Sequence, residues 1–305
     1  MDPSANAGPP EKRLLIVDGH AYAYRAFYAI RQLSSPTGQP TNAIYGFIRM
    51  LTKMVATVKP SHVIIVWDGG LAEERMVLWP DYKKTRAEMP ESLTPQLDEI
   101  AAYLKAASIT SFCQTGVEAD DWIAALCRQV SRAGAGVVIA SADKDFMQLV
   151  DDKVGLLNPG DKPEKIWTAT DVRNKLGVDP AQVVDYLSLI GDHVDNIPGV
   201  AGVGPKTAAD LLGQFGTIDN LLARLDEVKS ERIRQSLRQS QEAVRRNQSL
   251  IRLRDDLPCD FSWPVLSVQK GDYETLRRLF SGWGFSTLLQ ELEKAQGGSR
   301  DLFSA

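Results

Sequence analysis

Acidic side chains follow three short apolar runs in this sequence. Asp18, Asp68 and Asp143 each stand within three positions of the end of such a run. The runs are continuous and rich in β-branched residues, which is typical of strands buried on both faces of a parallel sheet. Because the carboxyl ends of parallel strands lie along one edge, where open α/β folds bind ligands, we expect these acids to converge. The three runs are residues 14–17, 63–67 and 137–140.

Six further acids enlarge this group to nine. A single strand-end aspartate is ordinarily a helix N-cap or a turn former. Nine converging carboxylates would instead repel one another and raise their pKa values unless a cation neutralised them. Hard oxygen ligands favour Mg²⁺, with Mn²⁺ as a substitute, and two such ions ~4 Å apart can activate a water and stabilise the leaving oxygen of a phosphodiester. The six are Glu118, Asp120, Asp121, Asp145, Asp192 and Asp195.

Nitrogen and sulfur ligands are too scattered to support other common site chemistries. The three cysteines lack any C-x-x-C pair, so neither a disulfide framework nor a cysteine zinc site is indicated. The three histidines are isolated, which argues against a histidine-rich metal site and against a Ser-His-Asp triad. Carboxylate chemistry is therefore the main prediction.

The elements that would position these acids alternate along the first half of the chain. Helical periodicity in residues 43–58, 97–107 and 119–132 predicts helices between the strands, and hence an α/β fold with a mostly parallel central sheet. A polar, basic insertion at about 73–95 is broken by three prolines. Near residue 180 the strands give way to Gly-Pro punctuation and Arg-rich helical sequence. The predicted divisions are a disordered tail at 1–12, a core at 13–180, a helical region at 181–290 and a tail at 291–305.

Charge is segregated rather than uniform in this chain of 305 residues and net charge −4. Between residues 229 and 254 there are eight basic and two acidic side chains, which fits a nucleic-acid surface or a solvated helix face. No apolar run approaches the ~20 residues of a membrane span, and the first ten residues resemble neither a secretory signal nor a transit peptide. We therefore expect a cytoplasmic monomer without a membrane partner.

Five motifs in order resemble one known group of enzymes. They are Asp18-Gly19 with Tyr24-Arg25-Ala26-Phe27, Tyr82-Lys83-Lys84-Thr85-Arg86, Glu118-Ala119-Asp120-Asp121, Ser141-Ala142-Asp143-Lys144-Asp145, and residues 191–199. From about residue 13 to 285 the chain resembles the 5′-nuclease (flap endonuclease) superfamily, in particular the 5′–3′ exonuclease domain of bacterial DNA polymerase I. The resemblance implies a PIN-like nuclease core, a helical arch at about 73–95, and a helix–two-turn–helix motif at about 185–215 in a C-terminal helical region.

The resemblance also implies roles for individual residues. Asp18, Asp68, Glu118 and Asp120 would serve one metal ion, and Asp121, Asp143, Asp145, Asp192 and Asp195 the second, with the division open because carboxylates can bridge. Lys83 and Arg86 would reach the scissile phosphate, and the catalytic set would be Lys83, Arg86, Asp18, Asp68 and Asp143. The DNA contacts would be Tyr24 and Tyr82 on the terminal base, Arg25 on a phosphate, and Gly202, Gly204, Lys206 and Thr207 beside a phosphate and a K⁺ ion.

The function predicted from these residues is a structure-selective, Mg²⁺-dependent 5′ nuclease acting in DNA replication and repair. Its substrates would be DNA with a 5′ flap, a nick or a free 5′ end, with RNA primers as secondary substrates. One alternative is a PIN-like ribonuclease, against which the helix–two-turn–helix and the arch argue. The other is a non-catalytic branched-DNA-binding module, which predicts missing metal-site acids. For Tyr82, packing within the insertion is an open alternative to base stacking.

Overall fold

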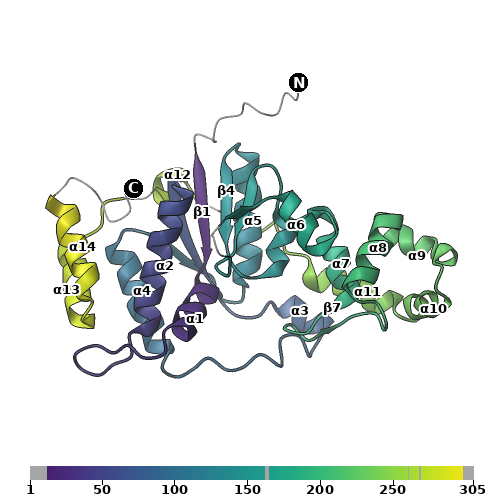
Figure 1. Cartoon of the computed structure of the whole chain (residues 1–305), viewed down its shortest axis with the longest axis horizontal. Helices are drawn as coiled ribbons and strands as arrows, with labels where there is room; N and C mark the ends of the chain where they lie inside the picture. The colour runs from purple at the N-terminus through teal and green to yellow at the C-terminus, as the bar shows by residue number, and fades with distance from the viewer. Residues whose placement is uncertain (1–11, 162–164, 260, 268, 298–305) are drawn as a thin grey trace.

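A six-stranded sheet forms the centre of the computed structural model, which describes residues 12–161, 165–259, 261–267 and 269–297 (Figure 1). The strand order is β3-β2-β1-β4-β5-β6, and all neighbours are parallel except the edge pair β5 and β6. This confirms the predicted mostly parallel sheet. The strands are β1 (Arg13–Asp18), β2 (His62–Trp67), β3 (Thr110–Cys113), β4 (Gly136–Ala140), β5 (Val154–Leu157) and β6 (Ile166–Trp167).

Both faces of the sheet are covered by helices, because alternate strand residues supply two separate cores. Leu14 and Ile16 of β1 pack in one core with helix α5 (Ala119–Arg132). Leu15 and Val17 pack in the other with α2 (Asn42–Val58) and α4 (Thr94–Ala106). Each such fully buried aliphatic side chain contributes roughly 1.5–3 kcal/mol relative to exposure. The continuous apolar runs of the sequence are explained by this two-sided burial.

The strand order reverses beside β1, which pairs with both β2 and β4. Asp18 ends β1 and begins helix α1 (Gly19–Ala29), where its Oδ1 accepts a hydrogen bond of 3.0 Å from the amide of Ala21. Ligands of open α/β sheets bind at such a reversal, outside the carboxyl ends of the strands. The fold therefore delivers Asp18 to the position where a site is expected.

The predicted arch insertion contains one short helix followed by turns. Helix α3 (Glu73–Leu78) is followed by turns at 80–85 and by irregular chain before α4, seen as a long connection in Figure 1. Pro80 and Pro90 disfavour the helical conformation in the residues before them, which limits the helix to one stretch. Most of the arch is thus held by tertiary contacts rather than by helical hydrogen bonds.

The segment 169–251 is mainly helical and extends away from the sheet (Figure 1). It includes a two-stranded hairpin in which Gly191 pairs with Pro198. A Cβ atom on Gly191 would lie 2.4 Å from the amide nitrogen of Gly199, so only glycine permits this close approach. The elements are α6 (Ala169–Leu176), α7 (Val183–Ile190), β7 (Gly191–Asp192), β8 (Ile197–Pro198), α8 (Pro205–Phe215), α9 (Ile218–Ala223), α10 (Glu231–Gln239) and α11 (Gln241–Ile251), with 3-10 helices η3 (Pro180–Gln182) and η4 (Leu225–Glu227), and the 3-10 helix η2 (Lys144–Leu149) precedes this segment.

The last helices return to the sheet domain. Phe280 of α13 (Tyr273–Trp283) and Leu288 of α14 (Ser286–Gly297) join the core that contains Tyr103 of α4, and α12 (Trp263–Leu266) precedes them. Helix α14 thus extends into the stretch predicted as a tail from residue 291, whereas the predicted tail at 1–12 lies outside the described residues except for Lys12. The division into domains itself stays a prediction. Among the described residues, no helix has the length and apolarity needed to cross a membrane.

Candidate active site

A pocket of about 710 Å³ opens at the carboxyl edge of the sheet, where the predicted acids were expected to meet. Its wall also contains Tyr24 of α1, Arg86 of the arch, and Lys144. Six of the nine predicted acids line it, and we call them the open cluster: Asp18, Asp68, Asp120, Asp143, Asp192 and Asp195. The other three, Glu118, Asp121 and Asp145, are not among the residues that line it.

The turn after β4 ties two acids of the open cluster together. The hydroxyl of Ser141 donates to Oδ2 of Asp18 at 2.9 Å and accepts from the amide of Asp143 at 3.1 Å. Asp143 in turn accepts from the amide of Asp145 at 2.8 Å and so caps η2. These bonds hold the Asp18 and Asp143 carboxylates in fixed orientations at the ends of adjacent strands.

Burial and mutual repulsion disfavour the ionised state of two acids in the open cluster, Asp18 and Asp120. Burial raises the pKa of Asp18 to about 6, and the neighbouring charges of Asp143 and Asp68 add to the shift. Burial, followed by repulsion from Asp143 and Asp18, also raises the pKa of Asp120 well above its usual range. A bound cation would relieve this cost, because it stabilises every ionised carboxylate around it.

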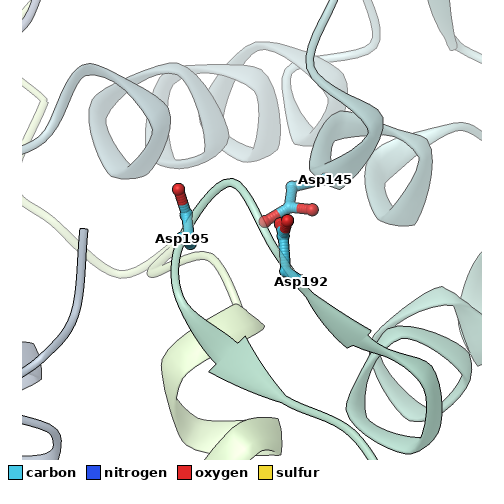
Figure 2. A group of neighbouring side chains, drawn as sticks. All are labelled: Asp145, Asp192 and Asp195. Carbon is cyan, nitrogen blue, oxygen red and sulfur yellow. The ribbon is translucent and has the colours of Figure 1, made fainter. Parts of the chain in front are cut away.

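A second group of acids lies between η2 and the β7–β8 hairpin. One carboxylate oxygen from each of Asp145, Asp192 and Asp195 lies within 4.8 Å of the others. Figure 2 shows Asp192 and Asp195 at the loop that joins the two short strands, with Asp145 facing Asp192 from a separate segment. The three side chains therefore form a compact set of hard oxygen donors.

This second group fits a divalent cation. Oδ1 of Asp145 is buried and has no hydrogen-bond partner among the described residues, and the ammonium of Lys144 approaches it only to 3.8 Å. The Lys144 ammonium instead donates to Oδ2 of Asp192. Burial and then the charge of Asp143 raise the pKa of Asp145. A buried carboxylate oxygen without a hydrogen-bond partner is available as a ligand for a metal ion.

A different arrangement, which we call the paired cluster, lies behind the pocket and consists of Arg75, Tyr82, Lys83, Glu118 and Asp121. The ammonium of Lys83 lies 2.6 Å from Oε2 of Glu118, to which the Tyr82 hydroxyl also donates at 3.2 Å. Although burial opposes it, the charges of Lys83 and Arg75 lower the pKa of Glu118. Each carboxylate here already has a cation.

Asp121 belongs to this paired cluster. Arg75 donates two hydrogen bonds of 2.7 Å to its carboxylate, and the amide of Arg254 adds a third at 2.9 Å. Arg75 also donates to the carbonyl of Leu250 and lies 3.2 Å from Oε2 of Glu118. Both carboxylate oxygens of Asp121 therefore have protein partners, and its predicted role as a metal ligand stays a prediction.

The arch residues are folded against acids. Lys83, only 5% exposed, has a positive φ of 56°, a conformation that is uncommon for lysine. Tyr82 is 3% exposed and belongs to the buried core that also contains residues of α5, so in this conformation its ring offers little surface to a base. Arg86 donates at 2.6 Å to Asp195 and lines the pocket. Tyr24 also lines the pocket, whereas Arg25 is exposed to solvent beside it.

The glycine loop, residues 199–204, lies before α8 and apart from the residues that line the pocket. Gly202 has a φ of 79°, Gly204 caps α8, and Lys206 is exposed in the first turn of that helix. The Arg232 guanidinium of α10 would lie 3.0 Å from a Cβ placed on Gly202. Thr207 stands half-buried in the same turn. Backbone amides and two basic side chains thus gather at one helix end.

Sequence reasoning assigned no role to several residues of the site. Ser141 and Lys144 lie inside a quoted motif, but their contacts with Asp18 and Asp192 depend on a turn whose geometry the sequence does not reveal. Arg75 lies in the insertion among other charged residues, and no pattern there distinguishes a buried arginine from an exposed one. His20, the neighbour of the Asp18-Gly19 motif, accepts a hydrogen bond of 3.1 Å from the Asp68 amide.

Comparison with known families and sequences places these features in context. Residues 13–177 match the 5′–3′ exonuclease N-terminal resolvase-like domain, and residues 178–274 match the 5′–3′ exonuclease C-terminal SAM fold. The chain is 37% identical over 294 residues to the 5′–3′ exonuclease of Aquifex aeolicus, covering 96% of this chain and 100% of that protein. It is 37% identical over 285 residues to DNA polymerase I of Bacillus caldotenax, covering 93% of this chain and 32% of that protein. The chain thus spans about a third of that polymerase.

Solved structures share the fold at lower sequence identity. A flap endonuclease variant of bacteriophage T5, in a complex with DNA and metal ions, aligns with a TM-score of 0.67 and 22% identity over 93% of this chain and 97% of that chain. The catalytic core of Rad2 in complex with a DNA substrate aligns with a TM-score of 0.63 and 18% identity over 94% and 91%. At these identities the likeness concerns the arrangement of the elements.

Proposed function

The chain belongs to the 5′–3′ exonuclease family, and from this membership we propose that it is a 5′ nuclease that hydrolyses DNA phosphodiesters at flaps, nicks or free 5′ ends in replication and repair. The observation that carries the proposal is the open cluster. Six carboxylates converge at the strand-order reversal, and burial and mutual repulsion raise the pKa values of several of them. Such a pocket is built to hold cations and a phosphate between them.

The residues fit two divalent ions, for which we propose Mg²⁺ with Mn²⁺ as a substitute. Asp18, Asp68, Asp120 and Asp143 would hold one, and Asp145, Asp192 and Asp195 the other. Bound ions would supply Lewis-acid activation of water and stabilisation of the leaving oxygen. Ser141 fixes the orientation of the Asp18 carboxylate, and Asp143 is fixed by its bond from the Asp145 amide. The product of hydrolysis would carry a 5′ phosphate.

The arch would supply positive charge to the reacting phosphate. Lys83 pairs with Glu118, and Arg86 pairs with Asp195. A phosphate entering the pocket would compete with Asp195 for the Arg86 guanidinium, whose fork suits two phosphate oxygens. Release of Lys83 from Glu118 would let its ammonium reach the negative charge that develops in the transition state. Both residues would then change partners when DNA binds.

Two surfaces outside the acids would position the substrate. Tyr24 at the pocket wall would stack on the terminal base, a contact that tolerates any base sequence. The glycine loop with Lys206 and Arg232 would contact the duplex backbone, and its carbonyl groups would suit a K⁺ ion. RNA primers are proposed as secondary substrates because stacking and phosphate contacts read little of the sugar. A cytoplasmic location and a monomeric state stay predictions.

The proposal is tested by cleavage of one 5′-labelled flap substrate beside the matching single strand and blunt duplex. We expect cleavage near the flap junction with Mg²⁺ or Mn²⁺, much slower cleavage of the other two DNAs, and none with EDTA. An all-RNA version of the flap serves as the control for the ribonuclease alternative. Preferential cleavage of that RNA, or cleavage that EDTA leaves unchanged, would contradict the proposal.

A further inference from the structure

An exposed aromatic residue, Tyr28, lies one helical turn beyond Tyr24 on α1. Its side chain is 67% exposed, although it is large and partly apolar. The rings of Tyr24 and Tyr28 are nearly parallel, with an interplanar angle of 16° and centroids 6.5 Å apart. Phe27 meets Tyr28 edge to face at a centroid distance of 5.1 Å. Two neighbours therefore help to hold the Tyr28 ring in place, while most of it faces solvent.

The two tyrosines connect this exposed ring with the pocket. Tyr24 lines the pocket, and Arg86 is close enough to act on the pKa of its phenol, which burial and then Tyr28 raise. Residues four apart on a helix lie on the same face, roughly 6 Å along the axis. A nucleic-acid strand whose end base stacks on Tyr24 would therefore carry its next unpaired base past Tyr28.

The surroundings of Tyr28 carry the charge that such a strand requires. Arg25 and Arg31 are exposed on either side of it in the sequence, and neither has an ion-pair partner in the described part of the chain. Aromatic rings interleaved with unpaired arginines are the usual composition of grooves that bind single-stranded nucleic acid. An apolar protein partner would not require these two free cations.

We propose that Tyr28 and Tyr24 form an aromatic ledge that stacks consecutive unpaired bases of the 5′ single strand, with Arg25 and Arg31 beside its phosphates. The proposal rests on the proposed function and adds a determinant of substrate choice. Tyr28 is useful only to a substrate that has an unpaired base beyond the one on Tyr24. It therefore favours longer flaps over nicks and single-nucleotide flaps, without contacting the reacting phosphate.

The test compares a nicked duplex with 5′ flaps of one, two and five nucleotides, using wild type, Tyr28→Ala and Tyr28→Phe. Binding is measured in Ca²⁺ and cleavage in Mg²⁺. Loss of one stacked base corresponds to about a 5- to 150-fold change in Kd. We expect Tyr28→Ala to weaken binding by this factor for the longer flaps only, and Tyr28→Phe to retain wild-type binding. Val265→Ala, an exposed apolar residue of α12, is the matched control.

A 2-aminopurine base in the flap reports stacking directly. Its fluorescence should be quenched by wild type and Tyr28→Phe at the second unpaired position, and not by Tyr28→Ala. The proposal would be contradicted if Tyr28→Ala weakened binding of the nick and of the long flap equally. It would also be contradicted if the fluorescence quenching persisted in Tyr28→Ala. These outcomes are distinct from failure of the proposed function, in which wild type would cleave none of the four DNAs.

Discussion

Two groups of carboxylates lie close together in this protein and differ in how many protein cations accompany them. In the open cluster, Lys144 pairs with Asp192 and Arg86 with Asp195, and among the described residues no salt bridge reaches the other four acids. The open cluster contains acids whose pKa values are raised by burial and repulsion, as for Asp18 and Asp120. In the paired cluster, Lys83 and Arg75 outweigh burial and lower the pKa of Glu118. The same side-chain chemistry thus leaves four acids of one group without a protein cation and makes the other group a structural support.

The motif at the start of α5 divides between these two groups. Glu118 and Asp121 are three residues apart, on one side of the helix start, and both contact Arg75. Asp120, rotated away from them, lines the pocket. Adjacent acids can therefore have different roles. Asp120 would contribute to cation binding, whereas Asp121 would contribute to stability. Each of the following predictions tests that contrast, beginning with the largest effect.

The largest effect is expected from removing a carboxylate of the open cluster. Asp143→Ala should reduce cleavage by at least about 10³-fold, because the site loses charge that holds a cation against the phosphate. Asp143→Asn can still accept the hydrogen bond from the Asp145 amide, but it should lose as much cleavage activity as Asp143→Ala. The free energy of unfolding should change little, since lost repulsion offsets the lost cap. The exposed Asp210→Ala is the control, and full-rate cleavage by Asp143→Ala would refute the role.

The next largest effect is expected from Lys83, whose ammonium pairs with Glu118 of the paired cluster and would move to the phosphate in the open cluster during the reaction. Lys83→Ala should lower the single-turnover kcat on a saturated flap roughly 10²–10³-fold and barely alter Kd in Ca²⁺, because the charge it meets grows in the transition state. Lys83→Arg should recover only part of the rate. Lys84→Ala, at an exposed neighbour paired with Asp81, is the matched control. A normal saturated rate with weakened binding would refute a catalytic role for Lys83.

The sequence was sufficient to predict the fold class and the edge at which the acids meet. The three apolar runs became β1, β2 and β4, and the pattern at 119–132 coincides with α5. These elements are long or strongly periodic, so local pattern and tertiary burial agree. The strand β3 was missed because it is a short edge strand with exposed alternate residues, Ser111 and Cys113.

The sequence could not predict which acids form ion pairs with basic side chains inside the protein. The pairing of Asp121 depends on Arg75, which is 46 positions earlier and is brought to α5 by the fold of the insertion. The burial of Lys83 has the same origin, because its contact with Glu118 spans 35 positions. Sequence spacing indicates a shared face of a helix, but it does not identify a distant partner of opposite charge.

A stability effect should distinguish Asp121 from its neighbour. Asp121→Asn leaves the buried guanidinium of Arg75 without its bidentate partner, which should cost about 3–5 kcal/mol in the free energy of unfolding. Affinity for Mn²⁺, measured by calorimetry on the folded variant, should stay unchanged. Asp120→Asn should behave in the opposite way, with weaker Mn²⁺ binding and stability that is kept or increased. Loss of Mn²⁺ binding at normal stability in Asp121→Asn would instead make Asp121 a metal ligand.

The smallest expected effect is the pH dependence of folding stability. It should have one sign for Asp18 in the open cluster and the opposite sign for Glu118 in the paired cluster. The pKa of Asp18 is about 6 in the folded protein and 3.8 in the reference state, so the folded state binds this proton more tightly. In metal-free protein its contribution to stability therefore falls as pH rises from about 4 to 6. The pKa of Glu118 is lowered, so its contribution is present above its reference value of 4.5 and is lost as pH falls below that.

Bound divalent cations should cancel the pH dependence of stability that arises from Asp18 and leave the pH dependence that arises from Glu118. Thermal unfolding in EDTA, compared with unfolding in Mg²⁺, should show a larger gain in Tm from the metal at pH 7 than at pH 5. Below about pH 6 a proton must leave Asp18 before a cation binds, so affinity should fall roughly tenfold per pH unit. Asp18→Asn removes one of these titrations and should reduce the difference between the two pH values, whereas a gain in Tm independent of pH in wild type would show that Asp18 is already ionised without metal.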